Sequence, residues 1–215
     1  MLAEFGAVTA SDGTKTTYSY SGVLNLAAGL AKPETWRDTA SALEKLYEAS
    51  GTKAPPAKPV ASAEPYPDNS TEAYNAIQCA DSVVPTTEDT YSKLAVSEDA
   101  RVGPFGRIAV FDMMTCAYWP QQAVQPYRGP WNRVTANPIM VINSRFDPAT
   151  SLKGATAGAG ELADARLLVV EGSGHSTMYV HSSCAERAKR NYFVSGDLPA
   201  SGATCGIDHS PFDPT

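Results

Sequence analysis

The sequence predicts an α/β fold in which residues 131–215 carry parallel strands and residues 1–130 are mostly helical. Two continuous apolar runs, "IMVIN" (139–143) and "RLLVVE" (166–171), have the β-branched composition of strands that are covered on both faces of a parallel sheet. A helical pattern follows each run. Strand, helix, strand, helix is the repeating unit of a doubly wound fold, whose reactive groups lie beyond the carboxyl ends of the strands.

The remaining elements follow from helical spacing and from turn residues. Apolar side chains recur at helical spacing over residues 33–50, where Pro33 lies near the first turn and Gly51 follows the end. Residues 52–68 contain five prolines and predict an extended connector. The expected helices cover about residues 18–30, 33–50, 70–81, 86 or 87 to 100, 106–119, 151–163 and 182–194, the last one stopped by Gly196.

Composition excludes several classes of protein. With 43% hydrophobic residues, the 215-residue chain has enough apolar side chains to build a core. Its formal net charge is −6 and its basic residues are scattered, which argues against a surface for nucleic acid or for an anionic membrane. The longest purely aliphatic run, Leu167–Val170, is far shorter than the ~20 residues that cross a bilayer. We therefore expect neither nucleic-acid nor membrane partners.

The four cysteines, Cys79, Cys116, Cys184 and Cys205, indicate an oxidising compartment. They permit three pairings into two disulfides, and four buried free thiols are the alternative. No two cysteines lie within four residues of each other, so the ligand spacing of a structural zinc site is missing, and we expect neither a metal nor another cofactor. The tripeptide "NST" beginning at Asn69 is an acceptor for N-linked glycan, which agrees with secretion.

The N-terminal segment does not have the features of a secretion signal. The stretch "MLAEFGAVTASDGTK" has no basic start and no apolar segment of signal-peptide length. One explanation is that Met1 is not the first residue of the natural precursor.

Two reactive residues follow the predicted strands, Asp147 in "NSRFDPAT" and His175 in "EGSGHST". Adjacent parallel strands bring consecutive loop ends together, so both side chains are expected at one edge of the sheet. In a serine hydrolase such a histidine takes the proton of the nucleophile, while the aspartate orients the imidazole and stabilises its charged form. Aspartate before histidine also matches the chain order of α/β-hydrolases. The alternatives are a turn-forming aspartate before Pro148 and a polar residue in a glycine-rich loop.

The segments "NPIMVINSRFDPATSLKGA" and "LLVVEGSGHSTMYVHSSCAERAKRNYFVSGDLPASGATCGIDHSPF" resemble the C-terminal region of secreted tripeptidyl aminopeptidase-like α/β-hydrolases, over about residues 136–212. The resemblance implies that Asp147 is the acid and that His175 is the histidine of the "GHS" turn. It also implies that Cys184 in the following helix is bonded to Cys205 after the "LPxxGxxC" pattern.

Two further segments, "AIQCAD" and "TCAYWP", resemble the helical cap of that family, which implies a second disulfide between Cys79 and Cys116. The helix that begins "PETW" resembles the cap less specifically. The implied fold is the C-terminal part of an α/β-hydrolase with a helical cap. Residues 1–130 would form the cap or lid, and residues 131–215 would form the last strands and helices.

The sequence departs from this family at the nucleophile. The "GxSxG" elbow occurs nowhere in the 215 residues, and "GSGHS" (172–176) is the histidine turn itself. We therefore expect a fold that lacks the N-terminal strands and the nucleophile elbow and begins inside the cap. Serines near the two loops are alternative nucleophiles, although none lies on an elbow and such serines more often cap helices. These serines are Ser144, Ser151, Ser173 and Ser176, and the weaker histidine candidates are His181 and His209.

The predicted function is that of a secreted serine hydrolase region, of the tripeptidyl-aminopeptidase-like exopeptidase type, acting on a peptide or an ester. The alternatives are a non-catalytic binding or structural remnant of a hydrolase and a secreted esterase with an unorthodox serine. Two strands of the buried type leave an open sheet edge, so we expect a partner. The candidates are the N-terminal half of the hydrolase, as a separate chain or a missing segment, a second copy of the chain, or strands within residues 1–20.

Overall fold

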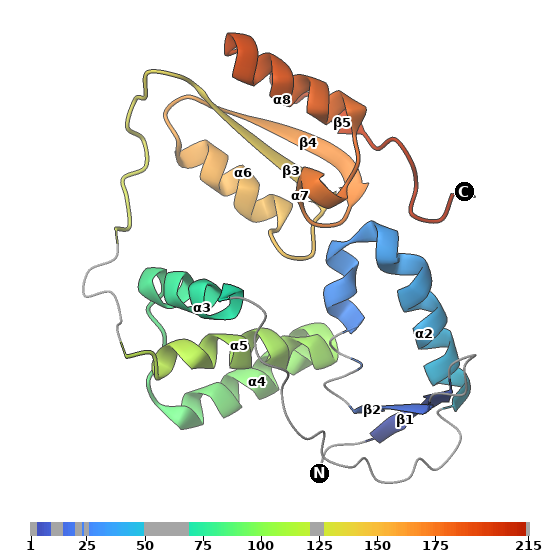
Figure 1. Cartoon of the computed structure of the whole chain (residues 1–215). Helices are drawn as coiled ribbons and strands as arrows, with labels where there is room; N and C mark the ends of the chain where they lie inside the picture. The colour runs from blue at the N-terminus through green and yellow to red at the C-terminus, as the bar shows by residue number, and fades with distance from the viewer. Residues whose placement is uncertain are drawn as a thin grey trace. The chain divides into compact units, whose positions relative to one another are not determined.

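The computed structural model of the chain describes residues 4–9, 15–19, 23, 26–49, 69–120 and 127–213. The chain divides into two compact units, which Figure 1 shows with their elements in chain order from blue to red: Met1–Lys58 together with Pro130–Thr215, and Pro59–Gly129. The first unit thus joins segments that lie far apart in the sequence, whereas the division expected from the sequence grouped residues 1–58 with the helical region. The predicted connector over residues 52–68 lies outside the described residues.

The first unit contains a three-stranded parallel sheet in the order β3-β4-β5. β3 (Ile139–Phe146) and β4 (Ala165–Ser173) are the two predicted strands, joined through α6 (Leu152–Glu161), and α8 (Ser183–Ser195) follows β4. β5 (Thr204–Gly206) was not predicted, because three residues without an apolar run carry no strand signal. Within the described part of the chain, β3 has β4 as its only neighbour, so it forms an edge of the sheet.

Helices α6 and α8 cover opposite faces of this sheet (Figure 1). On β4, Leu168 and Val170 belong to a buried cluster that includes Ala185 of α8. The neighbouring residues Leu167 and Val169 line a small cavity together with side chains of α6. Because successive side chains of a strand point to opposite faces, a strand between two helices is apolar at every position. This is the physical reason for the continuous apolar run from which β4 was predicted.

Capping residues define the ends of both helices. The hydroxyl of Ser151 accepts a hydrogen bond from the backbone N–H of Gly154, and that of Ser182 accepts one from Ala185, both at 3.2 Å. Such N-caps typically stabilise a helix by about 1 kcal/mol. Gly196, with φ 75°, adopts the left-handed conformation that ends α8, as its sequence predicted.

The N-terminal residues add a hairpin to the first unit. β1 (Glu4–Thr9) and β2 (Lys15–Ser19) pair with each other in a separate antiparallel sheet. The expectation that strands within residues 1–20 rebuild the parallel sheet is therefore wrong for the residues that the structure describes.

Helical residues follow the hairpin. The helix expected over residues 18–30 is confirmed in part: Val23 and Leu26 are helical and residues 27–30 belong to the 3-10 turn η1 (Ala27–Ala31), whereas residues 18 and 19 lie in the strand β2. The strand pairs with a segment further upstream, and helical spacing cannot report such a partner. A second 3-10 turn, η2 (Pro33–Thr35), leads into α2 (Trp36–Ala49), which lies within the helix predicted over residues 33–50.

The second unit is helical, with α3 (Ser70–Asp81), α4 (Glu88–Val102) and α5 (Gly106–Ala117) close to their predicted positions. The disulfide between Cys79 and Cys116 joins α3 to α5. Among the residues of this unit that the structure describes, the buried apolar side chains are those of Cys79, Tyr91, Ala95 and Cys116. Across the described ranges of the whole chain, every helix is too short or too polar to cross a membrane.

The backbones of α4 and α5 lie very close together at Gly106. A Cβ atom at this position would stand 2.3 Å from the backbone carbon and 2.4 Å from the backbone oxygen of Glu98. We expect Gly106→Ala to lower the free energy of unfolding of the second unit by about 2–3 kcal/mol, because the two backbones must separate. Urea unfolding followed at the backbone amides of α4 measures this change.

Gly158→Ala in α6 is the matched control, since nothing lies within 4 Å of a Cβ at that position. Alanine is the better helix former, so this variant should gain about 0.5–1 kcal/mol. A Gly106→Ala variant with the same free energy of unfolding as the parent protein would contradict the close approach of the two backbones.

Candidate active site

Asp147 is the first residue after β3, and its side chain is fully buried. One carboxylate oxygen, Oδ1, accepts hydrogen bonds from the backbone N–H groups of Ala149 and Thr150, both at 2.8 Å. The other, Oδ2, accepts from the Thr150 hydroxyl at 3.0 Å and from the backbone N–H of Ser176 at 3.1 Å. These donors fix the orientation of the carboxylate before any substrate is present.

His175 follows β4 in a turn that needs unusual backbone angles and leads into the short helix α7 (Ser176–Tyr179). Gly174 has φ 128°, which L side chains rarely adopt, and Ser176 has φ 56° in the left-handed region. This path points the Ser176 N–H at Asp147. It also brings Nδ1 of His175 to 3.1 and 3.0 Å from the two carboxylate oxygens. The structure thus brings the two predicted site residues into direct contact.

Electrostatics favours a charged carboxylate and one tautomer of the imidazole. Burial alone would raise the pKa of Asp147, but the three backbone N–H groups and the imidazole outweigh burial and hold that pKa below its usual value. A charged carboxylate can only accept, so Nδ1 of His175 must carry the proton and Nε2 keeps a lone pair. The His175 side chain is 34% exposed and that of Asp147 is not exposed, so a reacting group can reach the ring but not the carboxylate.

The four serines near these loops make structural contacts. Ser144 is buried, and its hydroxyl donates to a backbone carbonyl of the histidine turn. Ser151 caps α6, and the hydroxyl of Ser176 accepts from a backbone N–H of α7 at 3.2 Å. Ser173 lines a neighbouring cavity. In the ranges that the structure describes, no hydroxyl forms a hydrogen bond with Nε2 of His175.

The other two histidines, His181 and His209, lie near Asp208. The backbone N–H and the hydroxyl of Ser183, in the first turn of α8, donate to the Asp208 carboxylate and hold its pKa below the usual value, with smaller contributions from the histidines. Because the serine hydroxyl donates to the carboxylate and not to an imidazole, this cluster closes a helix end and lacks the arrangement of a catalytic triad.

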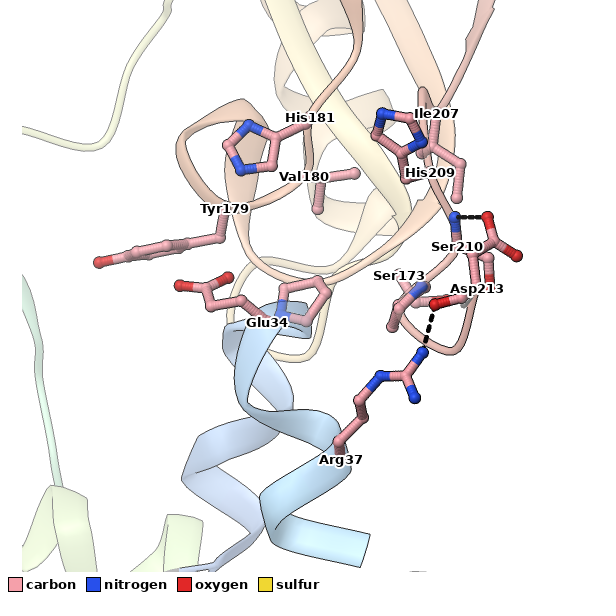
Figure 2. A pocket seen from close by; sticks show the side chains of 12 residues that line it. Glu34, Arg37, Ser173, Tyr179, Val180, His181, Ile207, His209, Ser210 and Asp213 are labelled. Atoms are coloured by element: carbon pink, nitrogen blue, oxygen red, sulfur yellow. Dashed lines mark hydrogen bonds between the residues drawn. The ribbon is translucent and has the colours of Figure 1, made fainter. Parts of the chain in front are cut away.

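A cavity of about 500 Å³ opens next to the histidine turn (Figure 2). Its walls come from the end of β4 and from α7 with the residues after it, from η2 and the beginning of α2, and from the segment after β5. The lining residues are Pro33, Glu34, Arg37, Ser173, Tyr179, Val180, His181, Ile207, His209, Ser210, Pro211 and Asp213. The Arg37 side chain donates to the backbone oxygen of Asp213. Neither Asp147 nor His175 belongs to the lining.

Both disulfides that the family resemblance implied are present. Cys184 lies in the first turn of α8 and Cys205 in β5, so their bond ties the helix to the outer strand of the sheet. Asn69 is exposed, directly before α3. Among the described residues, no group of three or more His, Cys, Asp or Glu side chains is arranged to hold a metal ion.

Sequence reasoning missed the groups that hold the carboxylate. Thr150 was not considered, and Ser176 was considered only as a nucleophile. A signal existed for Thr150, since an aspartate followed by "PAT" favours a turn in which backbone N–H groups two and three residues later bond the side chain. No local signal predicts the positive φ of Ser176.

Known hydrolases are similar to the C-terminal part of this chain. A family model described as "TAP-like protein" matches residues 100–205. The serine proteases Hip1 of Mycobacterium tuberculosis and Mycobacterium bovis are each 32% identical over 148 residues, which cover 64% of this chain and 27% of theirs. Carboxylesterase B of M. tuberculosis is 29% identical over 142 residues, covering 64% of this chain and 26% of its own. The chain thus spans about a quarter of the length of these curated relatives.

Proposed function

We propose that this chain, whose residues 100–205 match the model of the TAP-like protein family, supplies the acid and the histidine of a Ser-His-Asp α/β-hydrolase. The observation that carries the proposal is the 3.0 Å contact between Asp147 and His175 at the carboxyl ends of two adjacent parallel strands. Reactive groups of α/β sheets lie at this edge. Relatives named serine protease and carboxylesterase support the same class of reaction.

In this proposal His175 acts first as general base and then as general acid. Nε2 takes the proton of a serine hydroxyl while the oxygen attacks the acyl carbon, and then gives that proton to the leaving group. A water molecule releases the acyl group in the same way. Asp147 accepts the Nδ1–H throughout, which preserves the reactive tautomer and stabilises the imidazolium. The N–H groups that hold the carboxylate prevent it from turning away.

We propose that the serine and the oxyanion-hole donors come from a region outside these 215 residues. The sequence has no "GxSxG" string, and the relatives are about four times as long as the part that this chain matches. The edge strand β3 supports the same idea. Residues 139–142 are only half-buried on both faces of the sheet, and the open backbone ladder beside them suits a further strand of the hydrolase.

A peptide cleaved near its N-terminus is the first candidate substrate, in agreement with the resemblance to aminopeptidases. An ester is the second candidate, and the relative named carboxylesterase favours it. Turnover of a tripeptidyl anilide and of a short-chain nitrophenyl ester by the native preparation distinguishes them. Turnover of the ester with no cleavage of the tripeptidyl anilide would overturn the peptidase assignment and leave the hydrolase assignment in place.

A fluorophosphonate probe tests for the activated serine. Applied to the native preparation before denaturation, the probe should label a serine outside this chain, because the hydroxyl becomes nucleophilic only beside the imidazole. His175→Ala should abolish the labelling. His209→Ala is the matched control and should keep it, since His209 lies near Asp208 and not near Asp147. Intact mass before and after reduction identifies the labelled chain.

Two other outcomes would overturn this assignment. A label mapped to Ser144, Ser151, Ser173 or Ser176 would establish a local, unorthodox nucleophile. The absence of any label in a folded native preparation would favour a non-catalytic remnant that binds a partner through the open edge of β3.

We also propose that the protein is secreted. The two disulfides, one in each unit, favour an oxidising compartment. The exposed Asn69 is the proposed acceptor of an N-linked glycan. An unchanged intact mass after enzymatic removal of N-linked glycan from the natural protein would exclude this modification.

A further inference from the structure

The turn that carries His175 is held from outside by the two 3-10 turns that precede α2. The backbone N–H of His175 donates to the carbonyl oxygen of Ala31 at 2.8 Å. Beside it, a Cβ atom on Gly174 would stand 2.6 and 2.7 Å from the ring carbons of Pro33. Pro33, together with a methyl group of Val180 at 2.9 Å, thus occupies the space that a side chain at position 174 would need. The upstream segment is therefore in contact with two successive residues of the histidine turn.

A third contact reaches the helix after the turn. The ammonium group of Lys32 lies 5.1 Å from the ring centre of Tyr179 in α7, within the range of a cation–π interaction. Three consecutive residues, 31 to 33, thus contact the segment before, at and after the histidine.

The upstream segment is itself stiff, because its own hydrogen bonds close it. The hydroxyl of Thr35 donates to the carbonyl oxygens of Gly29 at 3.2 Å and Lys32 at 2.9 Å. The indole N–H of Trp36 donates to the carbonyl oxygen of Leu30 at 3.2 Å. A segment whose backbone is held by its own hydrogen bonds can keep the histidine turn in one position, whereas a flexible loop cannot.

The histidine turn needs such support. Ser176 has φ 56°, which a residue other than glycine rarely adopts, so the turn is held in a conformation that the isolated chain seldom populates. From the sheet side, Asp147 holds the imidazole and the Ser176 N–H, and the backbone oxygen of Phe146 accepts from the Gly174 N–H at 3.2 Å. The backbone N–H of His175 points the other way and is bonded to the upstream segment.

We propose that residues 31–33 are a positioning element for His175, which presses the histidine turn toward Asp147 and keeps Nδ1 within hydrogen-bond distance of the carboxylate. The inference rests on the proposed function only in taking His175 as the base. These residues touch no reacting group and act through the turn alone. The 3-10 turns η1 and η2 and the loops of Asp147 and His175 are thereby joined in one unit, which agrees with the division of the chain.

Pro33→Gly in the full chain tests the element, because it removes the ring that fills the space beside Gly174. By amide exchange measured with NMR, the His175 N–H should exchange with water roughly fivefold faster, since its hydrogen bond to Ala31 is loosened. The low-field signal of the His175 Nδ1 proton should be lost. The Gly174 amide, which is bonded to Phe146, is the internal reference and should keep its rate. Pro211→Gly is the matched control, because Pro211 lines the same cavity from the C-terminal segment.

A double-mutant cycle separates a direct contact between Pro33 and Gly174 from a general loss of rigidity in the protein. Gly174→Ala places a methyl group against the Pro33 ring and, less closely, against Val180. Pro33→Gly removes the first of these clashes, so the two changes combined should perturb the Nδ1 signal less than the sum of the single changes. If Gly174→Ala does not fold, Pro33→Ala provides a second variant without the proline ring, in which the same His175 signals are measured. Unchanged His175 signals in a folded Pro33→Gly protein, or zero coupling in the cycle, would overturn the inference. None of these signals requires catalysis, so a failed serine-probe experiment with an intact His175 response would count against the hydrolase proposal alone.

Discussion

In the Asp147→Asn variant, the hydrolase function proposed above predicts a fall in substrate turnover by a factor on the order of 10⁴. The carboxylate accepts from three backbone N–H groups, one hydroxyl and the imidazole. An asparagine keeps one oxygen for the N–H groups of Ala149 and Thr150 and therefore turns its NH2 group toward His175. The imidazole then accepts at Nδ1 and carries its proton on Nε2, where it cannot take a proton from serine.

The tautomer of His175 gives a second readout of this variant. Long-range proton–nitrogen spectra should show the proton on Nε2 in Asp147→Asn and on Nδ1 in the parent protein. Asp164→Asn is the matched control, because Asp164 is exposed and its backbone carbonyl, which accepts from Ile139 at 2.8 Å, is left in place. An Asp147→Asn protein with the parent's turnover would remove Asp147 from the mechanism.

The same substitution changes how stability depends on pH. The pKa of Asp147 is lowered by folding, so its contribution to stability is complete above the ordinary carboxyl pKa of ~3.9 and is lost as the pH falls through the lowered value. Asp147→Asn has no such group. The difference in melting temperature between the parent and the variant should therefore shrink on acidification, and a constant difference would contradict the lowered pKa.

Replacing Cys184 and Cys205 together by serine lowers the free energy of unfolding of the first unit by roughly 3 kcal/mol, because their disulfide closes a loop in the unfolded chain. In the folded unit the bond ties the first turn of α8 to β5, which has only three residues. The hydrogen bond from the Ser182 hydroxyl to the Gly206 carbonyl, at 2.7 Å, remains, so the variant should still fold. Urea unfolding followed at the backbone amides of β4 measures the loss.

The other disulfide provides the comparison. Replacing Cys79 and Cys116 by serine should destabilise the helical unit and leave the β4 amides unchanged, since the two bonds lie in different units. A loss below about 1 kcal/mol for the Cys184 and Cys205 pair would show that β5 and α8 hold each other without the covalent link.

Elements that are covered on both faces, or that show helical spacing, could be predicted from the sequence. β3 and β4 follow from continuous apolar runs, and α3 follows from spacing and a polar start. β5 and the β1–β2 hairpin could not be predicted in this way. β5 has only three residues, and its partner β4 defines it. The β1–β2 hairpin shows neither a continuous apolar run nor helical spacing, and its sequence signal is the Asp12-Gly13 pair between the two strands.

The candidate site could likewise be predicted only in part. Asp147 and His175 could be placed side by side because the ends of consecutive parallel strands meet. The residues that hold Asp147 and His175 in position could not be predicted. Ser176 reaches the carboxylate only through a positive φ, and Ala31 contacts the histidine turn from a segment that is remote in the sequence. Hydrophobic periodicity reports burial, and it contains no information about such contacts.

The two disulfides follow each other along the chain without interleaving, and this order matters during biosynthesis. Both thiols of the Cys79 and Cys116 pair leave the ribosome before either thiol of the Cys184 and Cys205 pair. Vectorial translation therefore favours the native pairing among the three possible ones, with little need for reshuffling by an isomerase. The contact between residues 31–33 and the histidine turn forms late, because residues 31–33 are translated early and His175 is translated late in synthesis.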